Sequence, residues 1–248
     1  MKEALLSGRK IEKIFGENKV LNGIDIDIYP EDFTVIMGAS GSGKSTLLYM
    51  LSGMDKVSSG KISYKENDIT SASEKEMTKL RADDFGFVFQ RTHLVSNLTL
   101  YENIVLAGYI SGKITEEESV SRANELVEKM NLTEAKMRLS SAVSGGEAQR
   151  AAVARAVISK PELLFADEPT GALNKSNTDE VLNLFTDLNS HGQTILLVTH
   201  DKEAALRGNR ILYIEDGAVI GELDLEPYQG RNKQREDKLS GWLESLRW

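Results

Sequence analysis

Residues 38 to 45 could hold phosphate groups, because they read Gly-Ala-Ser-Gly-Ser-Gly-Lys-Ser and complete the pattern GxxxxGK[ST]. An apolar run, 33 to 37, precedes them and a helix-forming segment, 46 to 52, follows, which is the strand–turn–helix context that the motif requires. Glycines let successive backbone N–H groups point into one concavity, and the helix start adds positive partial charge. A glycine-rich turn that binds nothing is the alternative. The candidate phosphate-binding residues are Gly38, Ser40, Gly41, Ser42, Gly43, Lys44, Ser45 and Thr46.

Two adjacent carboxylates, Asp167 and Glu168, end a second apolar run, 163 to 166. A buried strand places its last residue at the carboxyl edge of the sheet, where a phosphate loop also lies. There Lys44 would reach the outer phosphates, Ser45 would hold Mg²⁺ and Asp167 would steady the ion through water. Glu168 would polarise the water that attacks the γ-phosphate. The alternative is an ordinary acidic loop before a proline.

Residues 143 to 147, Val-Ser-Gly-Gly-Glu, open a predicted helix that continues through 148 to 158. Ser144 as N-cap and Glu147 three residues later form a capping box. That explains the serine and the glutamate but not Gly145 and Gly146, which a cap does not need. Glycines there would let a ligand approach the backbone N–H groups, as at a second anion site on a helix N-terminus. Both interpretations can hold together.

The rest of the pattern predicts a mixed α/β core with an antiparallel β layer and a helical insertion. The segment 100 to 157 has mostly helical patterning, with an acidic first turn in the helix 116 to 130. Asp216-Gly217 is predicted to be the two-residue turn of a hairpin. The other predicted strands are 24 to 28, 60 to 64, 85 to 89, 195 to 199, 211 to 214 and 218 to 223.

Composition limits the possible functions of this 248-residue chain. The net charge is −8 with no basic stripe to offset it, which argues against binding to a phosphate backbone, so no nucleic-acid partner is expected. With no cysteine, disulfides and thiol chemistry are excluded. No apolar run approaches the roughly 18 residues of a membrane span, and the start does not resemble a signal peptide.

The last 20 or so residues differ in character from what precedes them. Residues 227 to 237 are polar and are predicted to be a linker. Leu239, Trp242, Leu243 and Leu246 then recur at amphipathic helical spacing. This helix could pack on its own chain or a second copy, or it could contact a membrane surface or a partner.

With these motifs in this order, the chain resembles the ATP-binding subunits of ABC transporters from about residue 9 to 223. The resemblance adds Gln90 after one strand and His200 after another. It implies a P-loop ABC ATPase with a RecA-like core, binding ATP and Mg²⁺. By position, Phe15 matches the residue that stacks on adenine, Gln90 the one that links the metal site to a membrane partner, and His200 the one that contacts the γ-phosphate.

The resemblance also implies a head-to-tail homodimer. Two ATP molecules would be bound. Each would lie between the phosphate loop of one subunit and the Ser144-Gly145-Gly146-Glu147 helix start of the other. A membrane-spanning permease would dock near Gln90 to Leu100 and keep the protein peripheral on the cytoplasmic face. The implied domains are an ATP-binding domain, 1 to 226, with a helical subdomain at about 91 to 160, and a C-terminal linker and helix, 227 to 248.

Within the superfamily, segments 87 to 90, 98 to 103 and 167 to 173 are similar to one branch. It comprises lipoprotein-release, macrolide-efflux and bacitracin-type peptide-resistance systems, and the sequence favours the last of these. Two residues depart from the family pattern: Glu147 stands where glutamine is usual, and Asn174 where aspartate is usual. A cell-division type of regulatory ATPase and a non-transport ABC ATPase are the competing functions.

Overall fold

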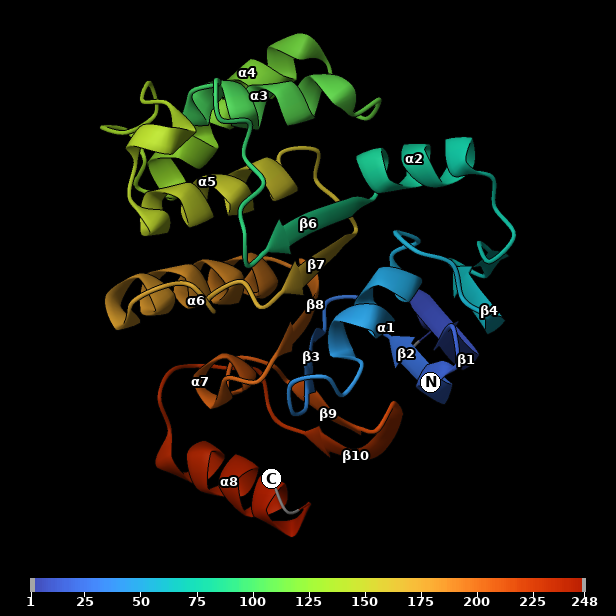
Figure 1. Cartoon of the computed structure of the whole chain (residues 1–248). Helices are drawn as coiled ribbons and strands as arrows, with labels where there is room; N and C mark the ends of the chain where they lie inside the picture. Colours follow the sequence, from blue (N-terminus) through green and yellow to red (C-terminus); the bar gives the residue numbers. More distant parts are fainter. Residues whose placement is uncertain (1–2, 247–248) are drawn as a thin grey trace. The chain divides into compact units, whose positions relative to one another are not determined.

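The computed structural model describes residues 3–246 (Figure 1). They form two compact units. Unit 1 runs up to Ser73 and resumes at Leu188, and unit 2 is Glu74–Asp187. The predicted helical subdomain, 91 to 160, lies inside unit 2. Each unit has its own set of strands and helices.

Unit 1 contains an antiparallel sheet with the strand order β2-β1-β4-β5. Its segment 24 to 28 places three isoleucines inside and two aspartates outside or half-buried, which is the alternation expected of a sheet with one solvated face. The predictions at 24 to 28 and 60 to 64 are therefore confirmed. The strands are β1 (Leu6–Phe15), β2 (Asn18–Ile28), β4 (Ser59–Tyr64) and β5 (Asn67–Asp68).

A second group of strands in unit 1 has the order β10-β9-β3-β8. β3 pairs in parallel with both β8 and β9, and every residue of β3 and of β8 is buried. Burial on both faces explains why these strands appear in the sequence as unbroken apolar runs. β9 and β10 form the predicted hairpin through Asp216-Gly217, both with positive φ. The strands are β3 (Phe33–Met37), β8 (Thr194–Thr199), β9 (Arg210–Glu215) and β10 (Ala218–Asp224).

The C-terminal helix packs on its own unit (Figure 1). Trp242 meets Tyr213 of β9 edge to face at 6.5 Å, and Leu239 and Leu243 are fully buried. The prediction of a linker over 227 to 237 is wrong for its second half, because the Asn232 side chain accepts from the Gln234 N–H and starts the helix at Lys233. The helices of unit 1 are α1 (Lys44–Leu51), α7 (Lys202–Ala205) and α8 (Lys233–Ser245).

Unit 2 holds two parallel strands, β6 (Phe85–Phe89) and β7 (Leu163–Asp167), in the register Phe89 to Asp167. Helices α3, α4 and α5 pack against one another, so the helical prediction for 100 to 157 is confirmed (Figure 1). Helices α2 and α6 were not predicted from the sequence pattern. The helices are α2 (Glu74–Asp83), α3 (Leu100–Ile110), α4 (Glu116–Lys129), the short 3₁₀ helix Ser140–Ala142, α5 (Gly145–Val157) and α6 (Lys175–Ser190).

Candidate functional site

The phosphate-loop motif joins the carboxyl end of β3 to the start of α1. Gly43 is the N-cap of α1 with φ +102°, a backbone conformation that residues other than glycine rarely adopt. A Cβ on Gly38 would lie 2.2 Å from the Ile214 carbonyl oxygen, so no larger residue fits there. A Cβ on Gly41 would instead project into open space. The loop is therefore held closely on one side and open on the other.

Two polar side chains lie inside this loop. Lys44 is 6% exposed, and its ammonium donates to the carbonyls of Gly38 (2.9 Å) and Ala39 (2.8 Å). The Ser42 hydroxyl is buried and has no hydrogen-bond partner among the residues that the structure describes. Buried polar atoms are almost always hydrogen-bonded, so this hydroxyl is available to donate to a group bound in the loop. A phosphate group fits this donor set, because it would accept from the hydroxyl and neutralise the lysine.

His200 and Phe15 also lie in unit 1. β3 and β8 are paired with Met37 opposite Thr199, so the phosphate loop and His200 leave the same edge of the sheet. Phe15 ends β1 and is 51% exposed, and the Lys13 ammonium lies 4.8 Å from its ring centroid. An exposed aromatic ring of this kind is available for stacking.

Unit 2 brings together Gln90 and the Asp167-Glu168 carboxylates. Because Phe89 is paired with Asp167, Gln90 and Glu168 both follow the carboxyl ends of their strands. Glu168 has φ +46°, a left-handed conformation that redirects the chain out of β7. A Cβ on Gly171 would lie 2.8 Å from the Gln90 Nε2 atom, so Gln90 lies against this turn.

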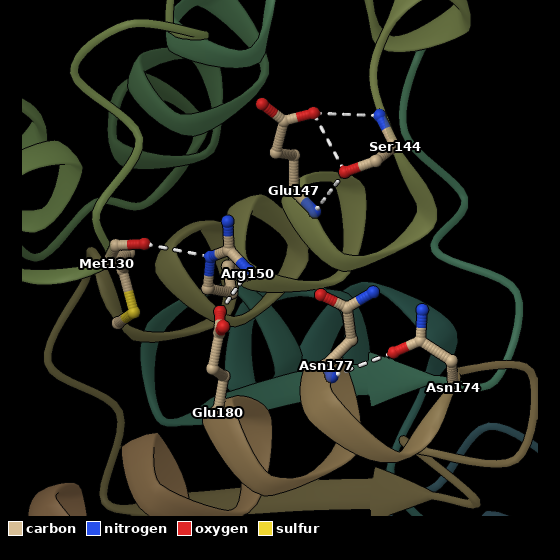
Figure 2. Close-up of polar contacts among 7 residues, drawn as sticks. All are labelled: Met130, Ser144, Glu147, Arg150, Asn174, Asn177 and Glu180. Carbon is tan, nitrogen blue, oxygen red and sulfur yellow. Dashed lines mark hydrogen bonds and ion pairs between the residues drawn. The ribbon is translucent and has the colours of Figure 1, made fainter.

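The predicted capping box is present at the start of α5 (Figure 2). Ser144 Oγ accepts from the Glu147 N–H at 3.3 Å, and the Ser144 N–H donates to Glu147 Oε2 at 2.8 Å. Hydrogen bonds from Ser144, with the Arg138 charge, hold the pKa of Glu147 below its usual range. The stabilising effect of this carboxylate is therefore present at neutral pH and is lost as the pH falls through that lowered pKa.

Packing explains only one of the two glycines that follow Ser144. A Cβ on Gly146 would lie 2.2 Å from the Asn177 side-chain oxygen of α6, so packing inside unit 2 explains this glycine. A Cβ on Gly145 would meet only Leu173, at an ordinary 3.7 Å. The argument for a ligand at this helix start therefore depends on Gly145.

Asn174, which replaces the usual aspartate, starts helix α6. Its side-chain oxygen accepts from the Asn177 N–H at 3.0 Å (Figure 2). Nearby, Arg150 of α5 pairs with Glu180 of α6 at 2.6 Å and donates to the Met130 carbonyl. These contacts fix α6 against the helix that Ser144 opens.

Several contacts that sequence patterns did not reveal hold the segment after Gln90. Arg155 of α5 donates to the carbonyls of Thr92 (2.8 Å) and His93 (2.7 Å). Gln149 of the same helix donates to the Phe89 carbonyl at 3.0 Å. Asn103 of α3 bonds both the N–H and the carbonyl of Val95. One arginine and two amides give no local signal in a sequence, because their partners are backbone atoms of distant segments.

The comparisons with known proteins agree with the resemblance inferred from the motifs. The family model described as ABC transporter matches residues 21–171. A macrolide export ATP-binding/permease protein of Marinobacter nauticus is 37% identical over 98% of this chain, and the chain spans only 39% of that protein's length. A lipoprotein-releasing system ATP-binding protein of Aquifex aeolicus is 39% identical over 88% of this chain and 97% of its own. A bacitracin export ATP-binding protein of Halalkalibacterium halodurans is 39% identical over 89% of this chain and 88% of its own.

Among solved structures, a dimeric ATP-binding cassette in a post-hydrolysis state with bound ADP and Pi has a TM-score of 0.82 to this chain. It is 34% identical and covers 90% of this chain and 100% of its own. The predicted fold class is therefore confirmed. Across residues 3–246, no helix has the length and apolar character needed to cross a membrane.

Proposed function

The chain belongs to the ABC transporter family as an ATP-binding, ATP-hydrolysing subunit, and from this premise we propose that it powers a membrane permease of the bacitracin-type peptide-resistance branch. The observation that carries the ATPase assignment is the phosphate loop of unit 1. Its buried lysine and its orphan serine hydroxyl are polar groups that a phosphate would satisfy. The branch assignment is supported by the bacitracin export relative, and the other two relatives leave lipoprotein release and macrolide export as alternatives.

We assign the chemical roles as follows. Lys44 neutralises the outer phosphates, Phe15 stacks on adenine and His200 contacts the γ-phosphate. Glu168 polarises the attacking water as general base. Ser45 of unit 1, and Asp167 and Gln90 of unit 2, each carry a hard oxygen donor of the type that Mg²⁺ prefers, and Mg²⁺ also keeps several waters and shares phosphate oxygens. When bound, Mg²⁺ would neutralise charge that develops on the phosphates.

The proposed homodimer is head to tail, with the start of α5 in one subunit facing the phosphate loop of the other. Gly145 is the position to test, because it is exposed and packing within its unit leaves room for a side chain. Gly145→Asp would set a carboxylate against the γ-phosphate bound by the partner. We expect turnover to fall at least about a hundredfold, while ATP binding by the monomer is unchanged.

Gly145→Ala and Ser144→Ala are the comparison variants. Loss of the cap alone costs about 1 kcal/mol of stability, so Ser144→Ala shows by its melting temperature how much of any defect is structural. Normal ATPase activity in Gly145→Asp would leave only the capping function for this helix start.

We propose that the permease docks on the segment from Gln90 to Leu100. Val95 is 45% exposed although its backbone is fixed by Asn103, whereas Leu94 and Leu98 are half-buried. A rigid backbone that presents an apolar side chain suits docking of a short partner helix.

We expect Val95→Lys to reduce co-purification with the permease at least about tenfold, with ATP binding retained. Ile220→Lys on β10, 42% exposed, is the matched control. Unchanged co-purification of Val95→Lys would remove this segment as the docking site.

The permease also decides between the branch assignments. The protein would lie on the cytoplasmic face of the membrane through this partner. Export of a peptide antibiotic, release of a lipoprotein and control of cell division would use the same ATPase. The number of spans and the size of the outer domain of the co-purified membrane protein, with sensitivity to bacitracin after deletion, would distinguish them.

The substitution Asn174→Asp tests how strongly the two subunits of the proposed dimer associate. The amide already caps α6, so Asn174→Asp keeps the cap while adding a charge. Charge-assisted hydrogen bonds are roughly twice as strong as neutral ones. We expect Asn174→Asp to raise turnover in parallel with ATP-dependent dimerisation, measured by light scattering, without changing monomer affinity. Lower turnover in this variant would show that the neutral amide is needed here.

A further inference from the structure

The Glu147 carboxylate lies at the start of α5 and uses its two oxygens differently. Oε2 accepts from both the N–H and the hydroxyl of Ser144, each at 2.8 Å, and this completes the capping box (Figure 2). Oε1 accepts from the Arg138 guanidinium at 2.6 Å. A neutral glutamine could supply the one acceptor that the cap requires. The negative charge and its pairing with Arg138 are therefore not explained by capping.

That charge lies where the proposed function places an anion. The first N–H groups of α5 carry the positive partial charge that would attract a γ-phosphate. A bare carboxylate in the same turn would oppose it, because like charges a few ångströms apart repel strongly where water is excluded. Glu147 has 20% of its side chain exposed, so solvent screens it only in part. A fixed cation beside it would remove the repulsion.

Arg138 is placed to do this. Its backbone is anchored on both sides, since its N–H donates to the Ala135 carbonyl at 2.9 Å and its own carbonyl accepts from the Leu100 N–H at 3.0 Å. Its side chain remains 47% exposed while its guanidinium contacts Glu147. The contact joins the loop before α5 to the first turn of that helix, within one unit.

We propose that Arg138 is a positioning residue that cancels the Glu147 charge, so that the start of α5 can receive the γ-phosphate of ATP bound to the partner subunit. This inference rests on the proposed function. Arg138 is needed because residue 147 is a charged glutamate and not a neutral glutamine.

A double-mutant cycle with Arg138→Ala, Glu147→Gln and the combined variant tests this directly. Turnover and ATP-dependent dimerisation are measured in the full chain. We expect Arg138→Ala to lower both about tenfold in the presence of Glu147, less than for fully buried like charges, because both side chains are partly exposed to solvent. In the Glu147→Gln background the same substitution should change them less than about twofold, so the combined variant outperforms Arg138→Ala. ATP affinity of the monomer should be the same in all four proteins.

Lys129→Ala is the matched control, because Lys129 forms an ion pair of the same length, 2.6 Å, with Asp187 in the same unit. Its effect should be equally small in both backgrounds. An equal loss from Arg138→Ala in both backgrounds would mean that the guanidinium contacts the nucleotide itself, and would overturn the inference. A loss that follows the melting temperature, or no loss at all, would overturn it too. If wild type neither dimerises with ATP nor hydrolyses it, the proposed function has failed before the cycle begins.

Discussion

Glu168→Gln should bind ATP as tightly as wild type and hydrolyse it about 10²–10⁴ times more slowly. Glutamine keeps the size of the side chain and an acceptor oxygen but cannot take a proton from the attacking water. Because ATP then persists, the variant should accumulate as an ATP-bound dimer. Single-turnover hydrolysis and light scattering measure the two effects separately.

Glu162→Gln, just before the start of β7, is the matched control and should hydrolyse ATP at the wild-type rate. Glu168 has a left-handed backbone conformation, which both glutamate and glutamine can adopt at similar cost. Turnover by Glu168→Gln within about threefold of wild type would show that another group activates the water.

Lys44→Ala should lose ATP affinity by at least about tenfold, and turnover with it, because a charged hydrogen bond to phosphate is worth about 1.5–3 kcal/mol. Lys44 also donates to two carbonyls of its own loop, so part of any loss could come from a disordered loop. Lys44→Met keeps most of the aliphatic stem and separates these effects. Titration with a fluorescent ATP analogue measures the affinity.

Lys19→Ala is the control for charge alone, since Lys19 is an exposed lysine of unit 1 that pairs with Glu12. It should bind ATP like wild type. Unchanged ATP affinity in Lys44→Ala and in Lys44→Met would contradict the assignment of the phosphate loop.

Predictability from the sequence differed between parts of the fold for physical reasons. The strands 33 to 37 and 85 to 89 were predicted with the bounds that the structure gives, because each is a short apolar run in a parallel strand, buried throughout in β3 and at three of five positions in β6. The box at Ser144 and Glu147 was predicted because a cap is a local interaction over three residues. Helix α8 begins within the predicted linker because its first two turns are polar and only Asn232 marks its start.

Interactions between distant segments were not predictable. The need for Gly146 comes from Asn177 of α6, a helix that the sequence pattern had not revealed. The position of Gln90 against Gly171 depends on the pairing of β6 with β7. A glycine required by a neighbour and a glycine open to a ligand look identical in a sequence, and only the structure distinguished Gly146 from Gly145.

The most direct test of the head-to-tail ATPase is to mix two inactive variants, Lys44→Ala and Gly145→Asp. If each site combines the phosphate loop of one subunit with the α5 start of the other, a mixed dimer contains one intact site. Random pairing makes about half of the dimers mixed, so the mixture should regain up to about a quarter of wild-type turnover. Turnover no greater than that of the two variants measured separately would contradict a site shared between two copies of this chain.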